Sequence, residues 1–241
     1  MLLISLTFFI TQMLFIVKNN PLAAKVGGAP FLVSHFFAKF ATVLVKLTHR
    51  GTKPTIKQPT FNAMNFIKQN IEGVWVIEPK RFGDKRGYFM ESFKLDEFRA
   101  HVGDVNFVQD NESFSTYGVL RGLHFQRGEW AQAKLVRVSR GCVLDVAVDL
   151  RPGSATFGQH VAVELSDENC RQLFIPRGFA HGFVVLSDVA QFQYKVDNVY
   201  APQAEATLRY DDHTVGIDWR LPADQLLLSD KDLKGLPLNE L

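Results

Sequence analysis

Arg121 and His124 place a cation and a titratable imidazole within one short, glycine-flanked segment, 118–126. Residues three apart face opposite sides of a regular strand, but Gly122 permits a bulge that would turn both side chains to the same side. Lys134 follows ten residues after His124, on the next expected strand. Three such groups close together indicate a site for an anionic substrate, although His124 taken alone equally fits a histidine of the core.

A second histidine and a tyrosine extend this candidate site. His181 lies among small residues at the start of an expected strand, where its ring can point into the mouth of a barrel. Tyr194 follows thirteen residues later in an apolar strand. A tyrosine in such a strand is more often a wall residue with its hydroxyl at the rim, so a chemical role for Tyr194 competes with a structural one.

These residue types suit proton abstraction beside a carbonyl group. The ordinary pKa of histidine, about 6.5, leaves His124 largely neutral at pH 7 and able to act as a base. Lys134 would hold positive charge near the enolate oxygen as it forms, and Tyr194 would return a proton from the far side. A base on one face and an acid on the other invert a carbon centre. The residues therefore favour epimerisation, which needs no cofactor when the substrate already carries the ketone.

A metal site is the main alternative for the histidines. Small β-barrels that bind a transition metal often use His-x-His with a glutamate and a later histidine, but Gln126 stands two residues after His124. Only His181 is left as a second imidazole ligand, and no acidic residue follows at an evident spacing. Such ligation normally takes three protein side chains, so we predict neither a metal nor another cofactor.

Charge divides the 241-residue chain into two unlike parts. Residues 1–63 carry seven lysines and arginines and no acidic residue, which leaves 20 of the 27 basic residues and all 25 acidic residues in 64–241. An acidic domain lacks the electrostatic footprint of a nucleic-acid-binding protein. Cys142 and Cys170 form no disulfide framework and have no metal-ligand spacing, so a reducing cytoplasm is the expected location.

The first 63 residues allow three interpretations. Residues 1–17 are apolar but shorter than the about 20 residues of a bilayer span, and they lack the charged start of a secretory signal. The segment is a membrane anchor, an organelle transit segment, or a stretch upstream of a true start at Met64. We favour the third interpretation because composition changes abruptly at Met64, and we expect residues 64–241 to have no membrane association.

From Met64 onward the sequence is typical of a mainly β protein. In 143–150, Leu144, Val146 and Val148 alternate with Asp145 and Asp149, as expected for a strand with two different faces. Further strands are expected at 183–186 and 190–196, and one short helix is expected at 95–101. Short strands with glycine and proline between them predict an antiparallel sandwich or barrel, and the absence of βαβ alternation argues against a dinucleotide-binding sheet.

Five motifs of residues 64–241 resemble those of the dTDP-4-dehydrorhamnose 3,5-epimerase family. They are 120–126 (LRGLHFQ), 134–138 (KLVRV), 145–151 (DVAVDLR), 176–183 (PRGFAHGF) and 194–195 (YK). The resemblance implies a cupin-type jelly-roll with a few short helices, and a homodimer. It also implies epimerisation at C3 and C5 of dTDP-4-dehydro-6-deoxy-D-glucose, which yields dTDP-4-dehydro-L-rhamnose.

The resemblance also implies roles for individual residues. It makes His124 the base, Asp232 the carboxylate that orients it, Tyr194 the proton donor and Lys134 the lysine that stabilises the enolate. It implies contacts with the sugar nucleotide for Gln109, Asp110, Asn111, Arg121, His181, Glu205 and Lys231. Arg86 and Glu91 resemble the pair that the family supplies across a dimer interface. Guanidinium groups such as those of Arg86 and Arg121 suit a diphosphate on chemical grounds alone.

Two departures from the family pattern concern loops. The segment 129–132 lacks an expected proline, and Tyr210 stands where a tryptophan is usual. Four alternatives remain for the function: an epimerase acting at one carbon, a ketoisomerase on a related substrate, a non-catalytic cupin that binds sugar nucleotides, and a metal-dependent oxygenase. The last is weakened by Gln126, and the third by the complete set of proton-transfer residues.

Overall fold

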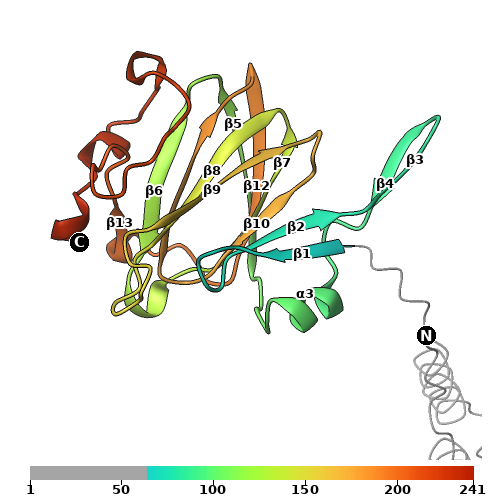
Figure 1. Ribbon diagram of the computed structural model, residues 1–241, viewed down its shortest axis with the longest axis horizontal. Helices are drawn as coiled ribbons and strands as arrows, with labels where there is room; N and C mark the ends of the chain where they lie inside the picture. The colour runs from blue at the N-terminus through green and yellow to red at the C-terminus, as the bar shows by residue number, and fades with distance from the viewer. Residues whose placement is uncertain (1–63) are drawn as a thin grey trace, which may run out of the picture. The chain divides into compact units, whose positions relative to one another are not determined.

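The computed structural model describes residues 64–241, and the expectations for residues 1–63 lie outside the described residues. Its strands form two antiparallel sheets that face each other as a sandwich (Figure 1). Their bounds are β1 (Met64–Lys68), β2 (Trp75–Pro79), β5 (Gln109–Thr116), β7 (Lys134–Arg140), β10 (Gln172–Ile175) and β12 (Val189–Val196) in the larger sheet, and β6 (Leu120–Gln126), β8 (Cys142–Asp149), β9 (His160–Ser166), β11 (Phe179–Val185) and β13 (Glu205–Thr207) in the smaller.

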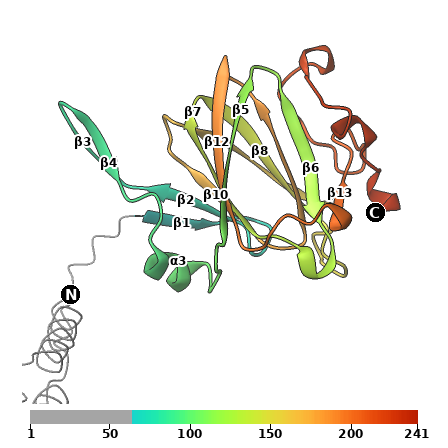
Figure 2. The ribbon, with the colours of Figure 1, turned by 180° about the vertical axis from the view of Figure 1, so that it is seen from behind.

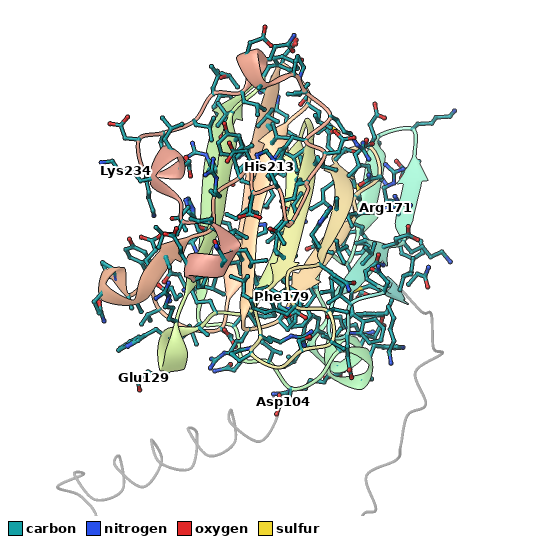
Figure 3. All side chains as sticks on the ribbon, turned by 60° about the vertical axis from the view of Figure 1, so that its left-hand side comes forward. Asp104, Glu129, Arg171, Phe179, His213 and Lys234 are labelled. Atoms are coloured by element: carbon teal, nitrogen blue, oxygen red, sulfur yellow. The ribbon has the colours of Figure 1, made fainter. Side chains whose placement is uncertain are left out.

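Strand order puts His124, His181, Lys134 and Tyr194 on inner strands of the two sheets. The larger sheet runs β1-β2-β10-β7-β12-β5, and the smaller runs β13-β6-β11-β8-β9. The main apolar cluster lies between them, with Val136, Val143 and Phe192 among its fully buried members. A second cluster, which includes Leu144 and Trp219, covers the outer face of the smaller sheet under the C-terminal segment. Figure 3 shows this segment in front of that sheet, marked by His213 and Lys234.

Both faces of β8 are buried, although its alternating sequence suggested one polar face. Leu144, Val146 and Val148 belong to the outer cluster, whereas Val143 and Ala147 belong to the cluster between the sheets. Asp145 and Asp149 share the parity of Val143 and Ala147 and are completely buried. Period-2 geometry therefore points the Asp145 carboxylate into the space between the sheets.

A bulge turns Arg121 and His124 to the same side of β6, as the glycine between them suggested. His181 pairs with His124 and Phe183 pairs with Arg121, so two residues of β6 face the single residue Gly182 of β11. Gly122 has φ +130°, and a Cβ there would come within 2.5 Å of the Gly182 backbone. Only glycine fits this crossing, because any side chain would force the two strands apart.

The β11 strand starts earlier than predicted. It spans Phe179–Val185 rather than starting at 183, so His181 lies inside the strand and not at its entrance. The small residues around His181 suggested the start of a strand. In the structure Gly182 instead permits the close approach to β6, where its own Cβ would lie 2.6 Å from the Arg121 carbonyl oxygen.

A two-stranded ribbon and a short helix complete the described fold. The ribbon of β3 (Arg81–Asp84) and β4 (Gly87–Met90) projects from the sandwich on the side away from β6 and β13, as opposite views show (Figures 1 and 2). The helix α3 (Leu95–His101) has the predicted bounds and buries Phe98. Short 3-10 turns follow at η2 (Gly128–Trp130), η3 (Pro202–Ala204), η4 (Ala223–Gln225), η5 (Asp232–Lys234) and η6 (Leu238–Glu240). Within residues 64–241, no helix has the length and apolar character needed to span a membrane.

Candidate active site

His124 and Asp232 form the first pair of the site. The His124 Nε2 lies 2.8 Å from the Asp232 Oδ1, and the Asp232 side chain is only 4% exposed. This is ion-pair distance, but the contact does not meet hydrogen-bond geometry. Asp232 lies in η5, and it also accepts hydrogen bonds from the backbone N–H of Gly122 at 3.1 Å and from the Ser229 hydroxyl at 2.5 Å.

These contacts keep Asp232 ionised. Burial by itself would raise the pKa of Asp232, but the close contact with His124 and the hydrogen bonds from Ser229 and Gly122 hold the pKa well below its usual range. A permanent negative charge therefore lies beside one nitrogen of the His124 ring. That charge orients the ring.

His181 on β11, the strand next to β6, forms a second pair with Asp145 on β8. The His181 Nε2 lies 2.9 Å from the Asp145 Oδ2, and His181 is paired in register with His124. Burial lowers the pKa of His181, although the neighbouring Asp145 partly opposes this effect. The second oxygen of Asp145 is buried without a hydrogen-bond partner. The two histidines thus lie side by side on adjacent strands, each backed by a carboxylate.

Lys134 and Tyr194 face these histidines from the opposite sheet. Lys134 starts β7 and donates a hydrogen bond from its Nζ to the backbone carbonyl of His124 at 3.4 Å. Burial lowers the pKa of Lys134 to about 8, against the opposing attraction of Asp145 and Glu205. Tyr194 packs on β12 against the cluster between the sheets. Burial raises the pKa of Tyr194, so its phenol is protonated at neutral pH.

Polar side chains of neighbouring strands surround this group. Asn111 pairs in register with Tyr194 and accepts a 2.7 Å hydrogen bond from Gln109. Arg121, which is exposed, donates to the Ser115 hydroxyl at 3.1 Å.

The other edge of the site carries a charged pair. Glu205 on β13 is ion-paired with Lys231 and accepts a 2.7 Å hydrogen bond from Tyr200. Burial alone would raise the pKa of Glu205, but these two partners lower it.

Three of the predicted residues do not join this group within one chain. Asp110 alternates with Asn111, so its side chain leaves the opposite face of the sheet, where it pairs with Lys195 at 2.9 Å. Arg86 lies in the turn of the β3–β4 ribbon and pairs with Asp84. Glu91 follows β4 directly. The ribbon projects on the side of the sandwich away from β6, the strand that carries His124 (Figure 2).

Asp145, Ser229 and Tyr200 were not predicted to belong to the site from the sequence. The signal for Asp145 was present, since an acidic residue alternates there with apolar residues in a strand that is otherwise apolar. Ser229 and Tyr200 gave no such signal, because their contacts with Asp232 and Glu205 depend on how irregular segments fold back. Among residues 64–241, no three histidine, cysteine or acidic side chains come together as a metal site would require.

Two cavities adjoin the site rather than coincide with it. One of about 320 Å³ lies behind Tyr194 on the outer face of the larger sheet, where Phe93, Arg137 and Gln193 line it. The other, a shallow groove of about 730 Å³, lies beside β13 and reaches Glu205 and Lys231. The proton-transfer groups themselves lie between the sheets. This arrangement can remove a proton from a bound ligand on one side and return a proton on the other.

Comparison with known proteins agrees with this chemistry. Residues 68–240 match the family described as dTDP-4-dehydrorhamnose 3,5-epimerase. The dTDP-4-dehydrorhamnose 3,5-epimerase of Escherichia coli (strain K12) is 53% identical over 179 residues, which cover 74% of this chain and 96% of that enzyme. The enzyme of the same name from Methanothermobacter thermautotrophicus is 52% identical over 176 residues, covering 73% of this chain and 95% of its own length.

Solved structures share the fold. The epimerase of Legionella pneumophila Philadelphia 1 in complex with dTDP-4-keto-L-rhamnose is 51% identical, with a TM-score of 0.70 over 73% of this chain and 93% of that one. A 3'-monoepimerase of Streptomyces bikiniensis in complex with dTDP-quinovose is 35% identical, with a TM-score of 0.67 over 72% and 87% of the two chains. The mainly β, cupin-type sandwich predicted from the sequence is therefore confirmed, and the chain belongs to the dTDP-4-dehydrorhamnose 3,5-epimerase family of isomerases.

Proposed function

We propose that residues 64–241 invert C3 and C5 of dTDP-4-dehydro-6-deoxy-D-glucose and release dTDP-4-dehydro-L-rhamnose, as a step of dTDP-rhamnose biosynthesis. Family membership supports the substrate and the reaction. The observation that carries the proposal is the position of the base and the acid. His124 belongs to the smaller sheet and Tyr194 to the larger, so a sugar ring bound between the sheets has one group on each face.

The first half of the reaction is proton abstraction beside the C4 ketone. Because the His124 Nε2 faces Asp232, Nδ1 is the nitrogen left to take the proton from C3 or C5. The electron pair of the broken C–H bond moves into an enolate, whose negative oxygen is stabilised by the Lys134 ammonium group. Asp232 stabilises the imidazolium that results, as a buried carboxylate beside a catalytic histidine does.

The second half returns a proton to the opposite face. Tyr194 donates its phenolic proton to the carbanion carbon, the enolate collapses to the ketone, and the carbon is inverted. The raised pKa of Tyr194 supports this order, since the phenol is present as the acid before each turnover. Solvent then restores the proton of Tyr194 and accepts the proton of His124, so no cofactor is consumed.

The nucleotide end of the substrate needs cations and polar groups outside the proton-transfer centre. Arg121 offers a guanidinium fork for the diphosphate, and Lys231 adds a second cation at the edge of the site. Gln109, Asn111, His181 and Glu205 are proposed to contact the sugar nucleotide. The Asp110 side chain lies on the opposite face of the sheet, where it pairs with Lys195, so the same chain's Asp110 is not proposed to contact the sugar nucleotide.

Arg86 and Glu91 support a homodimer. Both belong to the β3–β4 ribbon or its base, and the ribbon projects on the side of the sandwich away from β6 and β13 (Figure 1). A ribbon that carries Phe82, Tyr88 and Phe89 largely exposed is costly in water. Insertion of the ribbon into a second copy would cover these rings and bring Arg86 and Glu91 to the partner's nucleotide. The unpaired cysteines Cys142 and Cys170 support a reducing, cytoplasmic location.

Incubation with dTDP-4-dehydro-6-deoxy-D-glucose in heavy water should place deuterium at both C3 and C5, because each abstracted proton is replaced from solvent. His124→Ala should abolish exchange at both carbons, as measured by proton NMR. His213→Ala, which changes an exposed histidine of the C-terminal segment (Figure 3), should exchange like the wild type. Label at C5 alone would instead favour a single-carbon epimerase, a 3-keto product would favour a ketoisomerase, and binding without exchange would favour a non-catalytic cupin.

Tyr194→Phe should lower product formation by roughly 10²- to 10⁴-fold, the range ascribed to a general acid. The phenyl ring keeps the packing against Phe192, whose ring centroid lies 6.1 Å from that of Tyr194, so the melting temperature should change little. Tyr117→Phe is the matched control, since that hydroxyl binds Gln225 at 2.8 Å outside the site. Turnover of Tyr194→Phe at the normal rate would show that another group donates the proton.

Activity should depend on the charge of Lys134. With a pKa of about 8, the lysine is protonated below that pH and loses its charge above it. The value of kcat/KM should therefore fall as pH rises through about 8, because the enolate loses its stabilising cation. In Lys134→Arg the side chain stays charged (pKa above about 12), so its residual activity should lack this alkaline limb. If kcat/KM of Lys134→Arg fell at alkaline pH as it does in the wild type, the titration would belong to another group.

Dimers that combine two different variant chains test whether the β3–β4 ribbon contributes to the site of the partner subunit. Arg86→Ala/Glu91→Ala would remove the ribbon's contacts, and His124→Ala removes the base, so each variant alone should be nearly inactive at low substrate concentration. Co-expression should restore activity, because one site of the mixed dimer combines an intact His124 with an intact partner ribbon. Activity no higher than that of the two variants measured separately would indicate that the ribbon does not serve a partner's site.

A further inference from the structure

A group of polar side chains joins two loops at the end of the sandwich where β7 begins and β12 ends. One loop, 127–133, connects β6 to β7, and the other, 197–204, connects β12 to β13. Four side chains bridge them, and we call these the mouth clamp: Gln126, Gln132, Asp197 and Asn198. Opposite views show the two loops side by side at this end (Figures 1 and 2), and Glu129 marks the tip of the first loop in Figure 3.

Gln126 is the buried centre of the mouth clamp. Its Nε2 donates to the Trp130 carbonyl at 2.6 Å and to the Val199 carbonyl at 3.1 Å, and its Oε1 accepts from the Ala201 N–H at 2.7 Å. Both amide hydrogens and the amide oxygen are thus used, and the residue is only 7% exposed. A buried amide whose every group is bonded specifies one geometry for the segments it joins.

The rest of the mouth clamp ties the same loops at further points. Gln132 donates to the Asn198 carbonyl at 2.7 Å, and Asn198 donates to the Glu129 carbonyl at 2.9 Å. Asp197 accepts from the Ala133 N–H at 2.7 Å. Ala133 directly precedes Lys134, so this bond holds the start of the strand that carries the lysine.

The hydrogen bonds of Gln126 join β6, the strand that carries the base His124, to the loop that follows β12, the strand that carries the acid Tyr194. Gln126 and His124 are two residues apart on β6 and face the same side. Val199, which Gln126 binds, lies five residues after Tyr194. Among the described strands, no backbone ladder joins β6 to β12. The His124 ring is held separately by Asp232, so loss of the clamp would shift Tyr194 relative to a base that stays oriented.

We infer that Gln126 is a positioning residue that sets the separation between His124 and Tyr194 across the mouth of the sandwich. The inference rests on the proposed function, since it assigns Gln126 an effect on the second proton transfer. It also explains why glutamine suits the position where a metal-binding cupin would carry a second histidine. The amide binds the facing loop and leaves the imidazole of His124 free for proton transfer.

The test compares exchange with inversion in heavy water. Deuterium in recovered substrate reports abstraction by His124, and product formation reports abstraction followed by protonation from the other face. Gln126→Glu keeps the size and the oxygen that accepts from Ala201, but it sets a carboxylate oxygen against the Trp130 and Val199 carbonyls. Product formation should fall on the order of 10- to 100-fold, as expected for a displacement of about 1 Å. Exchange should fall less, so the ratio of exchange to product rises.

Two further variants keep the result interpretable. Asn198→Ala removes one hydrogen bond of the mouth clamp at a partly exposed position. Its ratio of exchange to product formation should also rise, by a smaller factor than in Gln126→Glu. Ser187→Ala is the control, because that hydroxyl accepts from Cys142 N–H at 2.8 Å and donates to the Val189 carbonyl at the other end of the sandwich. Its ratio should equal that of the wild type even if the protein is less stable.

The ratio does not depend on how much of a variant is folded, because both rates scale with the same active molecules. Equal losses of exchange and product in Gln126→Glu and Asn198→Ala would overturn the inference and leave Gln126 a purely structural residue. If the wild type itself showed no exchange, the proposed epimerase activity would fail, and the inference would fail with it. The two failures are therefore distinguishable.

Discussion

The gap between the two sheets is the constraint on which the site depends. Packed sheets stand about 10 Å apart, which leaves room for one sugar ring with a polar group on each face. His124 and Tyr194 come from different sheets, and among the described strands no hydrogen-bonded ladder spans from one sheet to the other. The apolar cluster between the sheets, short chain connections such as that from β7 to β8, and the side-chain bonds of the mouth clamp keep this separation.

Several charged groups of the site are buried. Asp145 and Asp232 are almost fully buried, and Lys134 loses enough hydration for its pKa to fall to about 8. Burial of such groups is unfavourable unless partners compensate. The same low dielectric strengthens the action of each charge on a developing enolate. Asp232 and Asp145 accordingly each have a histidine beside them, at 2.8 Å and 2.9 Å respectively.

Local patterns in the sequence predicted strands such as β8 and β12, the α3 helix and the residue types of the site. Alternation and glycine breaks carried this information, and Gly122 even indicated the bulge that brings Arg121 and His124 to one side. Contacts between distant segments could not be predicted from local patterns. Asp232 meets Gly122 across 110 residues of chain, and the family resemblance, not spacing, assigned Asp232 to His124. The small residues around His181 suggested the start of a strand, but Gly182 permits a close strand crossing inside it.

A crystal structure with an unreactive dTDP-sugar that lacks the 4-keto group would test the central claim most directly. The account predicts that the pyranose ring lies between the sheets, with the His124 Nδ1 near one face and the Tyr194 hydroxyl near the other. Lys134 should lie beside C4. A ring bound with both groups on the same face, or bound out of reach of the imidazole, would contradict it.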